Sequence, residues 1–316
     1  MAVWMWNLWP PAKTGTGPVA DGAGSPSPGL APNLQGALWI LAGVSFFSVM
    51  TVFFKMLGPV LGVSVVAFFR TAVGFMFVAP FALRFGLGGL VSNRKKLHFF
   101  RSLLGVSAIF CGVYSFSNLA MADVVALSFT RPLFLIILAV LFLGEQVRVR
   151  RWSATFVGFL GVLVMVRPTG DLEAATGVAL LGALLVAGSF VCTKKLSTTE
   201  RPSVMLFYMN AIAVCIAAGP AWYYWQTPDL SQLLMLLVMG GTAVAGQACV
   251  VRGLSVGEAT AVSPFTNIRI LLAAAIGYFM FDEIPDIWTW VGAAIIVAAS
   301  IYIARREHIR RGEASA

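Results

Sequence analysis

The chain has 316 residues, of which 59% are hydrophobic and only 11% are charged. Soluble domains usually carry roughly 25% charged residues, so this composition excludes an ordinary soluble protein. The mean hydropathy of +0.87 likewise indicates a polytopic membrane protein. The net charge of +9 can be explained by nucleic-acid binding, by binding to an acidic lipid surface or by membrane topology.

Residues 1–33 differ in composition from the rest of the chain. Trp4, Trp6 and Trp9 precede a segment rich in Pro, Gly, Ser and Thr, which has too few apolar residues to form a core. No basic stretch leads into a long apolar run, so we expect no signal peptide. We predict a disordered cytoplasmic tail at 1–33 and a short basic cytoplasmic tail at 306–316.

After this tail the chain is a series of apolar segments of about 20 residues, the length at which a helix crosses roughly 30 Å of hydrocarbon. The segments lack the alternating pattern of about ten residues that marks a strand of an outer-membrane barrel. We therefore predict an all-α membrane protein with ten transmembrane helices. The predicted helices are 34–56, 60–83, 97–120, 124–143, 152–166, 174–193, 203–225, 230–251, 259–281 and 287–304.

The basic residues predict the orientation of these helices. Ten crossings place both termini on one side, and 17 of the 22 Lys and Arg residues flank helices on that side. Only Lys55 and Arg167 lie on the other side, and the remaining three are inside helices. The positive-inside rule then predicts cytoplasmic termini in a bacterial-type inner membrane. Because this distribution accounts for the net charge, and no nucleic-acid-binding module is present, we expect no nucleic-acid partner.

The chain also contains a weak internal repeat. Each half has five helices, and because five is odd, the second half enters the membrane with the opposite orientation. Inverted repeats of this kind are a recurrent architecture of secondary transporters, with a duplicated scaffold or channel as the alternative. At a shift of 138 positions the repeat aligns Cys111 with Cys249, Arg131 with Arg269, Glu145 with Glu283 and Trp152 with Trp290, and at 139 it aligns Lys55 with Lys194.

Three stretches resemble a known family. Residues 122–145 (ADVVALSFTRPLFLIILAVLFLGE) and 158–168 (GFLGVLVMVRP) resemble the end of an EamA repeat, as do residues 257–283 (GEATAVSPFTNIRILLAAAIGYFMFDE). The family is the drug/metabolite transporter superfamily, with a first repeat at 34–167 and a second at 168–305. The resemblance implies a ten-helix basket with a central cavity. It also implies transport of amino acids, S-adenosylmethionine, riboflavin, nucleotide sugars or phosphorylated sugars.

Three arginines, Arg70, Arg131 and Arg269, lie inside predicted helices. A charge inside the hydrocarbon costs at least about 2.5–3.5 kcal/mol, so each should face a cavity or a partner. Arg131 and Arg269 each precede the closing glutamate of their repeat by 14 residues, or roughly 21 Å of helix rise. Because the two helices run in opposite directions, we expect these arginines at different depths.

No Asp or Glu lies deep in a predicted helix, which suggests that the arginines bind an anionic or zwitterionic substrate through bidentate contacts. The alternative is that they bond backbone carbonyls, helix ends or the membrane interface. Without a buried carboxylate or histidine, we expect exchange, facilitated diffusion or indirect proton coupling. Pro132 and Pro264 each remove a helix hydrogen bond, so we predict kinks that line the site.

A second group of candidate substrate contacts consists of polar or aromatic residues inside helices. An interhelical hydrogen bond is the alternative role for each of them. These residues are Tyr114, Asn118, Asn210 and Gln247.

Together these features predict an alternating-access secondary transporter of a small organic metabolite that carries a carboxylate or phosphate. An exporter or flippase of an amphiphilic, lipid-like molecule is the alternative, and a channel or membrane enzyme fits less well. We expect no catalytic residues, no metal and no cofactor, because no such motif occurs. The expected partners are the lipid bilayer and a small-molecule substrate. Ten helices can enclose a pathway as a monomer, and a homodimer is the alternative.

Overall fold

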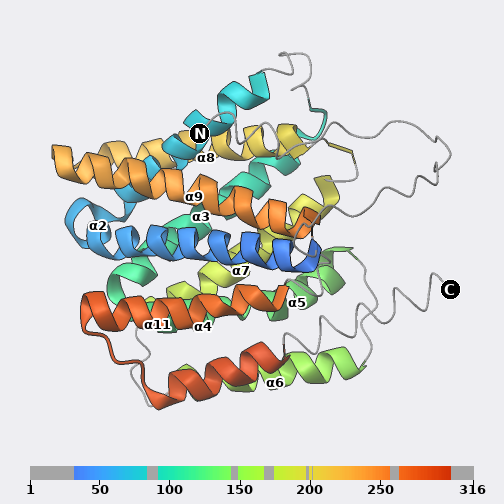
Figure 1. The fold of residues 1–316 in the computed structure, drawn as a ribbon. Coiled ribbons are helices and arrows are strands. Elements are labelled where there is room, and N and C mark those ends of the chain that lie inside the picture. The colour runs from blue at the N-terminus through green and yellow to red at the C-terminus, as the bar shows by residue number, and fades with distance from the viewer. Residues whose placement is uncertain are drawn as a thin grey trace, which may run out of the picture.

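The computed structural model describes residues 32–83, 92–143, 149–166, 174–196, 199–200, 202–256 and 263–299. These ranges fold into a bundle of antiparallel helices, and they contain no strand (Figure 1). The predicted tails lie outside the described residues, apart from the two positions that open the first helix. The all-α prediction is confirmed for this part of the chain.

The first two predicted spans form one long element, α2 (Pro32–Leu83), which reverses direction at Gly62. Gly62 has φ 74° and ψ 155°, a backbone conformation that residues with a Cβ rarely adopt. Glycine at this position therefore lets the chain turn back on itself (Figure 1). Pro32 opens the helix at a position where a missing N–H costs nothing.

The fourth predicted span is interrupted in the middle. It consists of α4 (Met121–Ser128) and α5 (Arg131–Leu143), with a turn at Phe129 and Thr130 between them. Pro132 has no N–H to donate to the carbonyl of Ser128, and the turn is instead tightened by the N–H of Phe129 bonded to the carbonyl of Ala126 at 3.0 Å. The helix is thus broken at membrane depth next to Arg131.

The corresponding span of the second half is interrupted in a similar way. A 3-10 turn, η2 (Ser263–Asn267), leads into α11 (Ile268–Phe281), and Pro264 lies in that turn. Arg269 is the second residue of α11. The other helices are α3 (Lys95–Asn118), α6 (Val149–Val166), α7 (Ala174–Leu196), α8 (Pro202–Tyr223), α9 (Leu230–Val256) and a last helix at Ile287–Ala299.

Six helices of the described part are long and apolar enough to cross a membrane, and three shorter apolar helices accompany them. The apolar part of α2, Leu34–Pro80, has 47 residues, or about 70 Å of helix rise, which is enough for two crossings of a 30 Å core. Each of the ten predicted spans thus corresponds to an observed helix or to one of the two legs of α2, the parts before and after Gly62. Large apolar side chains such as Leu141, Phe156 and Leu271 point outward, as expected for a lipid-facing surface.

Helices from the two halves of the chain interleave. The first half's α2 packs along α9 of the second half, and α3 packs along α7. Small residues allow close approach: a Cβ on Gly246 would lie 3.1 Å from the carbonyl oxygen of Gly43, and one on Gly182 would lie 3.0 Å from Cβ of Cys111. The interface between the halves therefore runs through the middle of the bundle, where the candidate site lies.

Candidate functional site

A small cavity lies between α3, α4, α5, α7 and α11. Its volume is about 60 Å³, and helices from both halves of the chain line it. Most of the lining is small or apolar, including Gly112 and Gly182. The polar lining residues are Ser115, Ser128, Arg131 and Arg269.

Within the described ranges, three buried polar atoms of residues at this cavity have no hydrogen-bond partner: Nε of Arg131, Nε of Arg269 and Oγ of Ser115. An unmade hydrogen bond at a buried polar group costs about 1–3 kcal/mol. Three unsatisfied polar groups at one place therefore need a structural or functional explanation. Here all three belong to residues that line the same cavity.

The broken helices place both arginines at the cavity. Arg131 is the first residue of α5 and Arg269 the second residue of α11, so each lies in the first turn of a helix that begins inside the membrane. A helix N-terminus carries a partial positive charge and unpaired N–H groups. Two such ends and two guanidinium groups make this region strongly attractive to an anion, the arrangement that transporters with discontinuous helices use.

Among the residues that the structure describes, no carboxylate pairs with the two arginines at the cavity. Arg131 and Arg269 line the same small cavity, so two like charges lie near each other there. Over the described ranges, neither guanidinium has an ion-pair partner. Both residues are half-buried, and a guanidinium group stays charged in proteins, so an anionic ligand would relieve both the repulsion and the missing hydrogen bonds.

The structure brings together only some of the predicted site residues. Arg131 and Arg269 line one small cavity, whereas the sequence predicted different depths for them. Arg70 lies on the leg of α2 after Gly62, outside the cavity lining. Asn210 lies on α8 near Arg70, because its Oδ1 is 3.0 Å from the place of a Cβ on Gly74, one turn beyond that arginine.

The remaining predicted contacts lie away from the cavity. Tyr114 and Asn118 are exposed on α3, where the amide of Asn118 donates to the carbonyl of Tyr114 at 2.7 Å. Gln247 is exposed on α9. Pro132 follows Arg131 at the helix break, and the side chain of Pro264 lies outside the described residues. Of these residues, Tyr114, Asn118, Gln247 and Pro132 are not part of the cavity lining.

Sequence reasoning missed Ser115 and a polar network around Lys55. Ser115 carries no sequence signal, because a serine inside a membrane helix usually bonds a carbonyl of its own helix. Lys55 and Glu283 form an ion pair that links the two halves of the chain. Their pairing joins residues 228 positions apart, and only the tertiary structure brings these helix ends together.

The fold is that of a multi-pass α-helical membrane protein, and its small internal cavity is lined by one arginine from each half of the chain. The chain belongs to the EamA-like transporter family, whose model matches twice, at residues 34–167 and 175–305. The family consists of transporters rather than enzymes, in agreement with the expectation from the sequence.

Curated relatives cover most of the chain. It is 32% identical to an S-adenosylmethionine uptake transporter of Rickettsia prowazekii over 271 residues, which is 85% of this chain and 92% of the relative. It is 31% identical to a riboflavin transporter of Rhizobium johnstonii, covering 86% and 91% of the two chains. A pseudopaline exporter, CntI, of Pseudomonas aeruginosa is 28% identical, covering 86% and 96%. These proteins are bacterial transporters of small molecules.

A solved crystal structure matches the fold. It superimposes with a TM-score of 0.58 and covers 88% of this chain and 98% of the other, at 16% sequence identity. At this identity the match concerns the fold alone.

Proposed function

We propose that this protein is an alternating-access carrier of a small organic metabolite with a carboxylate or phosphate group, located in a bacterial inner membrane. The observation that carries the proposal is the meeting of three unpartnered polar atoms, from Ser115, Arg131 and Arg269, at one cavity. Two of these residues belong to the first matched repeat and one to the second. A site shared between inverted repeats is where such carriers bind their substrates.

The size of the cavity suggests which part of the substrate binds there. Pockets for whole small molecules usually measure about 300–1,000 Å³, whereas this cavity has a volume of about 60 Å³. We infer that it receives an anionic head group, held by bidentate bonds from guanidinium groups. The rest of the substrate would occupy a wider space when one end of the bundle opens.

The names of the relatives supply the first candidates. S-adenosylmethionine carries an amino-acid carboxylate, whereas riboflavin carries neither a carboxylate nor a phosphate. The charged site therefore favours S-adenosylmethionine and other amino-acid-like carboxylates as the first compounds to test. Because the relatives include uptake transporters and an exporter, the assay should not depend on direction.

We also propose the orientation that the basic residues predict, with both termini in the cytoplasm and repeat boundaries at 34–167 and 168–305. In this orientation the starts of α3 and α8 face the cytoplasm. The turn of α2 at Gly62 and the end of α11 then lie at the opposite face of the membrane.

Counterflow in proteoliposomes tests the proposal. Vesicles preloaded with an unlabelled candidate are diluted into the labelled compound, using S-adenosylmethionine, an amino acid and a sugar phosphate, with riboflavin for comparison. We expect saturable accumulation of a carboxylate or phosphate compound, recovered chemically unchanged. Accumulation of riboflavin alone would contradict the anionic site, and non-saturable flux would indicate a channel.

A further inference from the structure

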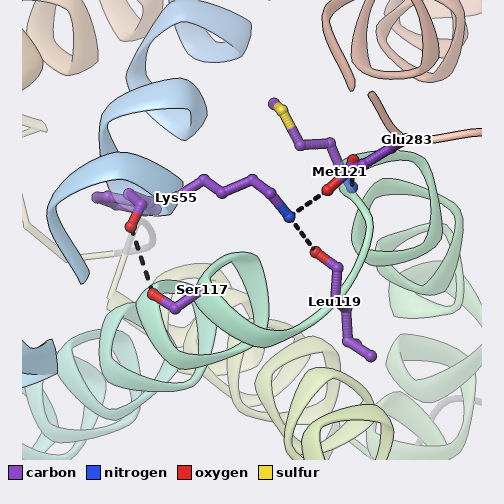
Figure 2. A network of polar contacts seen from close by, with 6 residues as sticks. Lys55, Ser117, Leu119, Met121 and Glu283 are labelled. Carbon is purple, nitrogen blue, oxygen red and sulfur yellow. Dashed lines mark hydrogen bonds and ion pairs between the residues drawn. The ribbon is translucent and has the colours of Figure 1, made fainter. Parts of the chain in front are cut away.

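A polar network joins α2, the link between α3 and α4, and the end of α11 (Figure 2). The ammonium group of Lys55 pairs with the carboxylate of Glu283 and donates to the carbonyl of Leu119 at 2.8 Å. The N–H of Met121 donates to the other carboxylate oxygen of Glu283, also at 2.8 Å. Both backbone groups lie at the link between α3 and α4, where helix ends leave groups unpaired. We call Lys55, Leu119, Met121 and Glu283 the latch.

The backbone conformation at the end of α11 positions Glu283 in the latch. Asp282 has φ 54°, so the chain turns back after Phe281, and the N–H of Glu283 bonds the carbonyl of Gly277 at 3.0 Å. A Cβ on Gly277 would lie 2.8 Å from a carboxylate oxygen of Glu283. The carboxylate therefore occupies space that only a glycine at position 277 leaves free.

The latch is largely shielded from solvent, and a second hydrogen bond accompanies it. The side chains of Lys55 and Glu283 are only 16% and 15% exposed, and the ammonium group lies 5.5 Å from the ring centroid of Phe281. A second bond joins the same two segments, because the hydroxyl of Thr289 donates to Asp123 at 2.7 Å. These contacts hold the region after α11 against the start of α4.

The latch connects the two repeats next to the cavity. Lys55 and the α3–α4 link belong to the first matched segment and Glu283 to the second. From Met121 in the latch, α4 reaches Ser128 at the cavity after seven residues, or roughly 10 Å of helix rise. The internal repeat also aligns Lys55 with another lysine and Glu283 with another glutamate, so both halves of the sequence keep these residue types at the same places.

We propose that the latch holds this end of the bundle closed, and that its rupture opens the cavity to this face of the membrane. The inference rests on the proposed function, since alternating access requires the two repeats to separate at each end in turn. Breaking the latch frees two charges and two backbone groups for water. Its strength therefore sets the ratio of the closed to the open form at this face.

Double electron–electron resonance between spin labels tests this proposal without a substrate. In a background with Cys111, Cys192, Cys215 and Cys249 replaced by alanine, labels at Val60 and Ile287 report on the latch end. Labels at Phe99 and Val251 report on the opposite end. All four label sites are exposed, and each pair joins the two halves of the chain.

Two variants weaken the latch in different ways. Glu283→Gln removes the charge but keeps an acceptor for the N–H of Met121, and Gly277→Ala keeps the charge but displaces the carboxylate. We expect both to raise the open-to-closed ratio at Val60–Ile287 by roughly tenfold, the size expected for one lost charge-assisted hydrogen bond. Lys96→Met, which removes an exposed lysine at the other end, should leave both distance distributions unchanged.

Unchanged latch-end distances in both variants, with melting temperatures near that of the parent, would overturn the proposal. A population that opens at both ends at once would also overturn it, because that result indicates general loosening. Counterflow on the same variants separates the two proposals. Wild-type counterflow with unaltered latch distances would refute the latch alone, and altered distances without anion counterflow in the parent would refute the proposed function alone.

Discussion

Arg131 and Arg269 line the same cavity although 138 residues separate them in the chain. Each lies in the first turn of a helix that begins after an interruption inside the membrane. The shift of 138 is also the one at which the two halves of the sequence align. Each half of the repeat thus contributes one guanidinium group and one helix N-terminus to the same cavity.

Replacing either arginine should weaken binding of an anionic substrate. We expect Arg131→Gln or Arg269→Gln to raise the Kd roughly 10- to 100-fold, because each removes hydrogen bonds to a charged group worth about 1.5–3 kcal/mol. The lysine variants should recover part of this loss, since they keep the charge without the bidentate geometry. Isothermal titration calorimetry on purified protein measures these effects.

The control for the arginine variants is Arg94→Gln, which removes an exposed arginine that bonds the carbonyl of Lys195. It should leave the Kd unchanged. An equal loss of affinity in the control would mean that overall charge, rather than the cavity, governs binding.

Ser115 should matter for binding but not for stability. Its hydroxyl is buried without a partner in the described structure, so Ser115→Ala should leave the melting temperature unchanged or raise it, while weakening anion binding several-fold. Ser117→Ala is the matched variant, because that hydroxyl donates to the carbonyls of Val113 at 2.8 Å and Phe54 at 3.3 Å. It should lower the melting temperature and leave the Kd unchanged; the reverse pattern would contradict the site.

Much of the fold follows from the sequence, because hydrocarbon thickness and backbone hydrogen bonding leave few solutions for apolar segments of this length. The break beside Arg131 follows from Pro132, which has no N–H to continue the helix. The residues that line the cavity were harder to predict from the sequence. Two of its four polar residues, Arg131 and Arg269, carry a strong signal, since charge inside a membrane is costly.

Other parts of the site depend on tertiary structure. Ser115 differs from other membrane serines only in what surrounds it. Lys55 marks a helix end in the sequence, and its partner Glu283 marks another, but their pairing depends on how α2 and α11 are arranged at one end of the bundle. Tyr114 and Gln247 are polar residues inside spans, and the sequence does not reveal that both are exposed and outside the cavity lining.

Close packing between the halves should make one of two adjacent glycines indispensable. A Cβ on Gly240 would lie 2.4 Å from Cβ of Val73, so Gly240→Ala should destabilise the protein by about 1–3 kcal/mol through overpacking of α9 on α2. At Gly241 a Cβ meets nothing within 4 Å, so Gly241→Ala should be neutral or stabilising. Thermal unfolding of both variants measures the difference, and equal melting temperatures would contradict the packing described for these helices.

His98 should tolerate an apolar aromatic replacement. Its ring is fully buried and stacks on Tyr208 with 4.6 Å between centroids, and neither ring nitrogen has a hydrogen-bond partner in the described structure. His98→Phe keeps the stacking and removes two unpaired polar atoms, so the melting temperature should stay the same or rise. His98→Ala should lower it by leaving a void. If both variants are equally destabilised, the ring nitrogens make an essential polar contact.

The recognition of an anionic head group by the two arginines is tested most directly by a thermodynamic cycle on protein and ligand. The carboxylate compound found by counterflow, with S-adenosylmethionine as the first candidate, is compared with its carboxamide in binding to the parent and to Arg269→Gln. We predict that the variant loses roughly tenfold or more in affinity for the carboxylate and almost none for the carboxamide. Equal losses for both ligands, or no loss for either, would contradict a carboxylate held at Arg131 and Arg269.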